Sequence, residues 1–182
     1  LAHTPFKDHL PKTYRYTEKS LLLALSRHKS LYIKPSSGSV GDGIIKVNQV
    51  LNNQYSLQWK KGKAHLFTYS KMIVKLKTLI KKDSYIIQEA IPLAKYHGRP
   101  YDIRVSVQRD GTGKWQVTGM AGKVAAPHRH VTNVAKGGTV KRCELLFDNS
   151  GFVSAVMQQS IRQLSLDMAQ YLGKHLSHLA DI

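Results

Sequence analysis

The sequence predicts an α+β fold, because segments typical of antiparallel hairpins are mixed with segments of helical periodicity. The clearest hairpin pairs residues 101–109 with residues 115–124 across the turn sequence Asp-Gly-Thr-Gly. A long amphipathic helix is indicated after residue 151, where apolar side chains recur at steps of three and four. Together these two patterns favour antiparallel sheets with packed helices.

The first half of the chain contains five further expected elements, two helices and three strands. Thr17 followed by Glu18 is typical of a helix start, and leucines continue this short helix over residues 20–27. Two strands separated by a glycine-rich loop occupy residues 31–47, and an exposed strand is expected over residues 55–59. Apolar residues at helical spacing then predict an amphipathic helix over residues 67–80, with Phe67, Met72, Ile73, Leu76 and Ile80 on its apolar face.

The middle of the chain is less regular. Residues 85–87 form a compact strand that ends before Pro92, and residues 93–100 are expected to be a loop. Residues 125–139, rich in His, Lys and Gly, are expected to form a second loop.

Charge is the strongest bulk property of the chain. It carries 28 Lys and Arg against 11 Asp and Glu, a formal charge of +17, which predicts an anionic partner such as a nucleotide or another polyanion. A generally basic, solvated surface is the alternative explanation for most of these lysines. No segment approaches the roughly 20 apolar residues of a membrane span, so no membrane partner is expected. The single Cys143 fits a reducing interior, and the chain is expected to be cytoplasmic.

Residues 31–47 hold the most informative motif, a lysine on one strand followed by a glycine-rich loop and a second strand. Gly38, Gly41 and Gly43 let backbone N–H groups approach an anion, which suits a loop that covers phosphates. Walker, dinucleotide-binding and protein-kinase loops are disfavoured, because Lys34 precedes the glycines and an apolar strand follows them. An ordinary hairpin, in which the glycines serve only the turn, is the alternative.

Two further features are candidates for the same nucleotide site. Gln88 and Glu89 follow an apolar strand, and such a break presents main-chain groups to an adenine edge between apolar walls. Asp102 and Arg104 lie two apart on a strand and share a face, so that the Asp would orient the Arg toward a phosphoryl group or a carboxylate. The alternatives are a solvated strand end and a structural surface pair.

Other chemistry is disfavoured by the pattern of residues. His128 and His130 have no Cys or further His at a zinc-like spacing. Cys143 has no His partner that the sequence can assign, which favours a bystander thiol. No G-x-S-x-G motif and no RNP or KH signature is present, so a nucleic-acid partner is possible but disfavoured.

Taken in order, the lysine strand, glycine loop, Gln-Glu hinge, Asp-x-Arg hairpin and Asn-x-x-x-Gly-Gly loop resemble the ATP-grasp fold. More narrowly, four segments resemble the YheC/YheD family of endospore-coat-associated ATP-grasp proteins: YIKPSSGSVGDGIIKV, YIIQEAIPL, GRPYDIRVSVQRDGTGKWQVTGMAGKVA and TNVAKGGTV. The similarity runs from about Leu10 to the C-terminus. It implies two small α+β lobes, residues 1–84 and 85–182, that enclose a nucleotide cleft.

The resemblance also implies how the nucleotide would be held. Lys34 would bind the phosphates, and the glycine-rich loop would close over them. Gln88, Glu89 and Ile91 would line the adenine site. The loop residues concerned are Ser36, Ser37, Gly38, Ser39, Gly41 and Gly43.

Catalysis in this family implies two further residues and two cofactors. Arg104, beside Asp102, would contact phosphate or substrate, and Asn133 would lie by the transferring phosphoryl group. ATP and Mg²⁺ are the implied cofactors. The complete protein would activate an unknown carboxylate as an acyl phosphate and transfer the acyl group to an unknown amine. The resemblance also implies spore coat components as partners.

The chain departs from the family pattern in two places. ATP-grasp enzymes usually hold Mg²⁺ with an Asp and a later Glu-x-Asn strand, and no Glu-x-Asn follows the long helix here. We therefore assign no metal ligands and expect a catalytically inactive fragment that also lacks an N-terminal domain. The acid that often holds the ribose after the hinge is replaced by Leu93, Ala94 and Lys95. A non-catalytic basic module of the spore coat, or one that binds a polyanion, is the alternative function.

Overall fold

The computed structural model describes residues 4–37, 43–59, 63–80, 84–127, 129 and 132–176. The chain divides into two compact units, Leu1–Pro92 and Leu93–Ile182, and each is described by itself. The sequence predicts a boundary between residues 84 and 85. The strand that follows, β6 (Tyr85–Glu89), pairs with two strands of the first sheet and therefore belongs to the first unit. Within the described ranges, no helix is long and apolar enough to cross a membrane.

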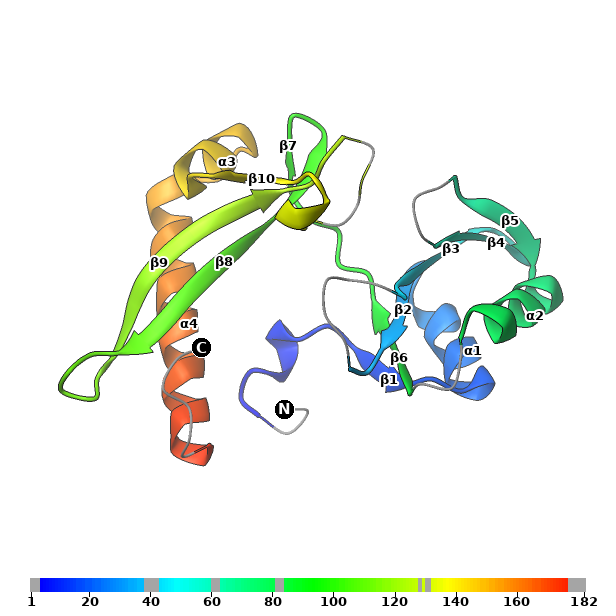
Figure 1. The fold of residues 1–182 in the computed structure, drawn as a ribbon, viewed down its shortest axis with the longest axis horizontal. Coiled ribbons are helices and arrows are strands. Elements are labelled where there is room, and N and C mark those ends of the chain that lie inside the picture. Colours follow the sequence, from blue (N-terminus) through cyan, green and yellow to red (C-terminus); the bar gives the residue numbers. More distant parts are fainter. Residues whose placement is uncertain are drawn as a thin grey trace. The chain divides into compact units, whose positions relative to one another are not determined.

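In its described residues, the first unit contains a six-stranded antiparallel sheet and two α-helices (Figure 1). The strand order is β1-β6-β2-β3-β4-β5. A short 3₁₀ helix precedes the sheet. This 3₁₀ helix is η1 (Lys7–His9), and the elements besides β6 are β1 (Thr13–Arg15), α1 (Glu18–Arg27), β2 (Ser30–Pro35), β3 (Ile45–Leu51), β4 (Gln54–Trp59), β5 (His65–Thr68) and α2 (Tyr69–Leu79).

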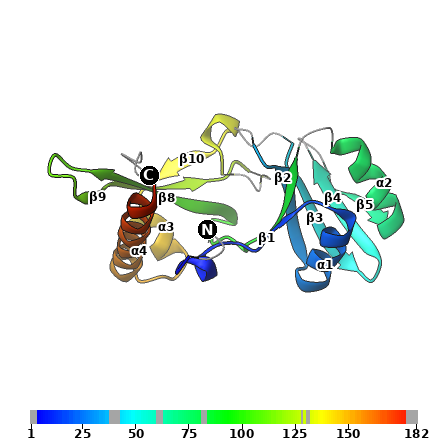
Figure 2. The same ribbon diagram turned by 90° about the horizontal axis from the view of Figure 1, so that it is seen from below.

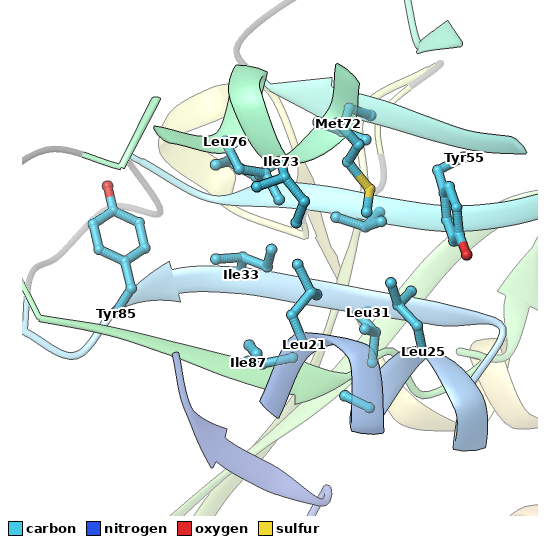
Figure 3. Close-up of a cluster of buried hydrophobic side chains, with 14 residues drawn as sticks. Leu21, Leu25, Leu31, Ile33, Tyr55, Met72, Ile73, Leu76, Tyr85 and Ile87 are labelled. Atoms are coloured by element: carbon cyan, nitrogen blue, oxygen red, sulfur yellow. The ribbon is translucent and has the colours of Figure 1, made fainter. Parts of the chain in front are cut away.

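Both helices pack on one face of this sheet, because strand residues alternate between apolar and polar side chains. Leu31 and Ile33 of β2 are fully buried against the apolar sides of α1 and α2, where Leu21 and Leu76 are also fully buried (Figure 3). The side chains of the other face, which we call the polar face, follow from the register of the strands. They include Thr13, Arg15, Ser30, Tyr32, Lys34, Lys46, Asn48, Ser56, Gln58, Leu66, Ile86 and Gln88.

The two helices of the first unit begin differently. Thr17 caps α1 as predicted: its hydroxyl accepts the Ser20 N–H at 3.0 Å, and the Ser20 hydroxyl accepts the Thr17 N–H at 2.9 Å. The prediction that the second helix starts at Phe67 is wrong. Phe67 lies in β5 opposite Tyr55, since pairing with β4 outweighs the local helical spacing, and α2 begins only at Tyr69.

The second unit is a four-stranded antiparallel sheet in the order β10-β9-β8-β7. Figures 1 and 2 show its long helix, α4, packed across the β8–β9 hairpin. The predicted hairpin and long helix are confirmed, whereas β7 lies in a segment expected to be a loop and α3 was not expected. The elements are β7 (Lys95–Tyr96), β8 (Arg99–Arg109), β9 (Trp115–Val124), η2 (Val134–Lys136), β10 (Thr139–Lys141), α3 (Cys143–Asn149) and α4 (Ser154–His175).

The second core forms where α3 packs on β8 and β9. Tyr101, Val124 and Leu146 are buried there, and the Tyr101 hydroxyl lies 3.0 Å from the Ser150 hydroxyl. Gly122 of β9 lies directly beneath Leu146, so closely that a Cβ at this position would overlap the Leu146 Cδ1 atom. The absence of a side chain at Gly122 therefore sets the distance between α3 and the sheet.

We predict that Gly122→Ala lowers the free energy of unfolding by about 1–3 kcal/mol, because the added methyl group overpacks the contact with Leu146. Chemical denaturation of the purified chain measures this difference. Gly119→Ala is the matched control on the same strand, since a Cβ there meets no atom within 4 Å. Equal stability of the two variants would contradict the packing described.

The turn between β8 and β9 is organised by Asp110. Its carboxylate accepts hydrogen bonds from the Thr112 hydroxyl at 2.7 Å, the Thr112 N–H at 2.9 Å and the Lys114 N–H at 3.0 Å. Led by the bond from the Thr112 hydroxyl, these contacts lower the pKa of Asp110 from 3.8 to about 2. The folded hairpin therefore favours the ionised carboxylate.

We predict that Asp110→Asn destabilises the protein at neutral pH and that the difference from wild type disappears in acid. A carboxyl group with a lowered folded pKa contributes stability above its unfolded pKa of 3.8 and loses it as pH falls through about 2. Denaturation at a series of pH values measures both effects. A stability difference that stays constant over this range would mean that the charge of Asp110 does not stabilise the turn.

Candidate functional site

Lys34 lies on the polar face of the first sheet, on the strand that leads into the glycine-rich loop. The alternation that buries Leu31 and Ile33 turns Tyr32 and Lys34 toward the opposite side. In the pairing of β2 with β6, Lys34 is opposite Ile86 and Tyr32 is opposite Gln88. The predicted lysine of the loop motif and the predicted Gln of the hinge are thus brought onto neighbouring strands.

A chain of side-chain hydrogen bonds holds the Lys34 ammonium in place. Lys34 Nζ donates to Gln88 Oε1 at 2.7 Å, and Gln88 Nε2 donates to Thr13 Oγ1 at 3.0 Å. The chain crosses β2, β6 and β1, so that three strands fix one cation. Since the partner of Lys34 is a neutral amide, the lysine keeps its charge uncompensated by this contact and remains suited to an anion.

The glycine-rich loop is described only at its two ends. Gly38, Ser39 and Gly41 lie outside the described residues, whereas Ser36, Ser37 and Gly43 lie within them. The Ser36 N–H donates to the Ser84 carbonyl at 2.8 Å, which ties the start of the loop to the start of β6. Gly43 has φ +73°, a left-handed conformation that requires glycine before the chain enters β3.

The hinge residues point to opposite sides of the sheet. Gln88 is on the polar face with Lys34, whereas Glu89 pairs with Leu31 and directs its carboxylate to the helix side. There Glu89 Oε2 lies 3.3 Å from His28 Nδ1, at the end of α1. Ile91 follows β6 and is 52% exposed. The structure therefore brings the Gln88 side chain, but not that of Glu89, beside Lys34.

In the second unit, Asp102 contacts the predicted Arg104 and also Thr132, the residue before the predicted Asn133. Asp102 Oδ2 accepts a hydrogen bond from Arg104 at 3.0 Å and another from the Thr132 hydroxyl at 2.8 Å. Arg104 is 62% exposed and Asp102 only 26%, so the carboxylate is the anchor and the guanidinium remains accessible. Arg104 can therefore meet an anionic group while Asp102 orients it.

Thr132 connects this pair to the loop that carries Asn133. Asn133 Oδ1 accepts the Ala135 N–H at 2.9 Å and begins the short η2 turn. The turn ends at Gly137 in a left-handed conformation, and the Gly138 N–H returns to the Asn133 carbonyl at 3.1 Å. The Asn-x-x-x-Gly-Gly motif thus closes a small loop whose position depends on Asp102.

Several polar residues near these groups were not singled out from the sequence. Tyr32 and Lys46 share the polar face with Lys34, and Lys123 is opposite Asp102 in the β8–β9 register. Only strand pairing reveals these positions. Thr132 directly precedes Asn133 in the sequence, and this adjacency is the signal that could have identified Thr132 as a site residue.

The described residues contain no group of three His, Cys, Asp or Glu side chains that would hold a metal ion. No residue of the described ranges is therefore assigned as a Mg²⁺ ligand. His128 and His130 lie outside those ranges. Cys143 is buried in the second core, and burial raises the pKa of its thiol.

Comparison with known proteins identifies the family of the chain. A family model described as YheC/D-like ATP-grasp matches residues 1–182. The chain belongs to the YheC/D-like ATP-grasp family. It is 30% identical over 158 residues to the endospore coat-associated protein YheD of Bacillus subtilis strain 168, a match that covers 83% of this chain and 33% of that protein. The chain therefore spans about a third of that relative's length. No solved structure matches.

We predict that Asp102→Ala makes the Asn133 loop of this ATP-grasp chain more mobile, because Thr132 loses its hydrogen bond to Asp102. Hydrogen–deuterium exchange should quicken at the Ala135 and Gly138 amides, which are both bonded to Asn133. Arg104→Ala is the control, since it leaves the bond between Thr132 and Asp102 intact. Unchanged exchange in Asp102→Ala would refute the anchoring role.

Proposed function

We propose that this chain binds ATP as the nucleotide-binding part of an ATP-dependent carboxylate–amine ligase. The observation that carries the proposal is the Lys34 ammonium, held 2.7 Å from Gln88 Oε1 on the polar face of the sheet. Lys34 lies at the end of β2, where the glycine-rich segment begins. A preplaced cation next to glycine-rich backbone is suited to a phosphate chain. Membership of the ATP-grasp family supports ATP over other polyphosphates.

The proposed reaction has two steps. A carboxylate oxygen of the substrate attacks the γ-phosphorus of ATP, the bond from that phosphorus to the β–γ bridging oxygen breaks, and ADP leaves. An amine then attacks the acyl carbon of the acyl phosphate, loses a proton, and inorganic phosphate leaves as the amide forms. Which carboxylate and which amine react is a property of the whole protein.

The residues of this chain would contribute position and charge neutralisation to that reaction. Lys34 would hold phosphate oxygens of the nucleotide, with Gln88 fixing the direction of its ammonium. Arg104, oriented by Asp102, and Asn133 would contact the phosphoryl group as it is transferred. Mg²⁺ would accompany ATP and screen its phosphates, although the described residues supply no cluster to hold it.

We also propose that the complete protein acts in association with the endospore coat. The support is the Bacillus subtilis relative, which is an endospore coat-associated protein and is 30% identical to this chain. Because the chain covers 33% of that relative, this association is a property proposed for the whole protein.

We predict that saturating Mg-ATP raises the melting temperature of the chain. At a concentration of 100 times Kd, binding stabilises the folded state by about 2.7 kcal/mol. Lys34→Ala should remove most of this shift, because a charged hydrogen bond to phosphate contributes about 1.5–3 kcal/mol. Lys71→Ala, which removes an exposed lysine of α2 outside the polar face, should keep the shift.

Absence of a shift in wild type would refute the ATP site. A rival result is affinity for polyanions that falls steeply with salt and does not depend on Lys34, which would identify a basic, non-catalytic binding module instead.

A further inference from the structure

Lys46 occupies the centre of the polar face and is not part of the Lys34 hydrogen-bond chain. It lies opposite Tyr32 on β2 and opposite Gln58 on β4. Its ammonium is 5.8 Å from the centroid of the Tyr32 ring. Among the residues that the structure describes, no carboxylate lies within ion-pairing distance of Lys46.

The polar side chains on both sides of Lys46 are already engaged with one another. On one side, the Ser30 hydroxyl donates to Asn48 Oδ1 at 2.7 Å, and Asn48 Nδ2 donates to the Ser56 hydroxyl at 3.1 Å. On the other side, Gln88 Oε1 accepts from Lys34. These two networks leave Lys46 between them, as a cation whose described contact is with an aromatic ring rather than with an acceptor.

This position is unfavourable for the Lys46 ammonium when no anionic ligand is bound. Lys46 is about half-buried, and its burial lowers the pKa of its ammonium. Removing a cation from water without a counter-charge costs free energy, so buried charges are normally paired. Ionisable groups whose pKa is shifted by burial are concentrated at functional sites. A half-buried cation is suited to a ligand of negative charge.

Lys46 is also a near neighbour of Lys34. Because Tyr32 is directly opposite Lys46, and Lys34 lies two residues further along the same strand, the two lysines are diagonal neighbours on one face. Diagonal pairs of this kind lie about 7–8 Å apart, within reach of long side chains. Ammonium groups on neighbouring positions of one face repel each other, and an anion between them would offset that repulsion.

We propose that Lys46 is a second nucleotide-contacting lysine, which binds a phosphate oxygen of the same nucleoside polyphosphate as Lys34. This inference rests on the proposed ATP site and adds a residue to it. It also explains why a half-buried cation is kept on the polar face, where its charge is useful only when the ligand is bound.

The proposal has two opposite consequences for one substitution. Lys46→Met keeps the aliphatic stem but removes the charge, so the ligand-free protein should melt at the same or a higher temperature than wild type. The same variant should bind ATP at least about tenfold more weakly, as expected for the loss of one charge-assisted bond. A purely structural lysine would lose stability without a selective loss of ATP binding.

The experiment is calorimetric titration with Mg-ATP of wild type, Lys34→Ala, Lys46→Met, Lys46→Arg and Lys71→Met, together with the melting temperature of each ligand-free chain. Lys71→Met is the matched control, because it removes the same charge from an exposed position on α2. Lys46→Arg retains a cation and should keep most of the affinity of wild type, and it remains informative if Lys46→Met folds poorly.

Three outcomes of the titrations test the role of Lys46. A tenfold loss in Lys46→Met, with Lys71→Met unchanged, supports the proposal. Wild-type affinity in Lys46→Met, alongside a clear loss in Lys34→Ala, overturns the role of Lys46 and leaves the ATP site intact. An absence of ATP binding by the wild-type chain overturns both the site and the role of Lys46.

Discussion

The alternation of side chains along β2 is the constraint on which the first unit depends. Leu31 and Ile33 are fully buried beneath α1 and α2, and this fixes which face of the strand Lys34 must take. A slip of one residue would bring Lys34 into the apolar core and expose both aliphatic side chains, at a cost that no local contact offsets. The same packing that stabilises the sheet therefore places the lysine, and Gln88 and Thr13 then fix its ammonium. Stability and the candidate nucleotide site share one physical origin.

In the second unit, the alternation of side chains along β8 likewise separates a buried residue from a candidate site residue. Tyr101 of β8 packs into the core beside Leu146, while the next residue, Asp102, faces the opposite side of the hairpin. Asp102 then gathers Arg104 and Thr132 through one carboxylate oxygen. Each unit thus contains a small hydrogen-bonded group in which a polar residue on one strand orients a cationic one. In the first unit an amide orients a lysine, and in the second a carboxylate orients an arginine.

Much of the fold was predictable from sequence because its signals are local. The Thr17 cap, the β8–β9 hairpin and the long α4 each depend on residues close together in the chain. The start of α2 was not predictable, since Phe67 fits a helix locally but pairs with Tyr55 across the sheet. Lys34 and Arg104 were found through motifs, whereas the opposed directions of Gln88 and Glu89 and the position of Lys46 depend on strand register. Register joins residues far apart in sequence, so no local pattern reveals it.

The central claim is that the Lys34 ammonium faces the phosphates of a bound nucleotide. An acyl-phosphate derivative of ATP tests it most directly, because an amine next to the terminal phosphate attacks the acyl carbonyl, becomes acylated and releases ATP. Mass spectrometry then locates the modified lysine. Acylation is expected on the polar face, at Lys34 or its neighbour Lys46, and an excess of unmodified ATP should suppress it. Modification spread over exposed lysines such as Lys71, and indifferent to ATP, would contradict it.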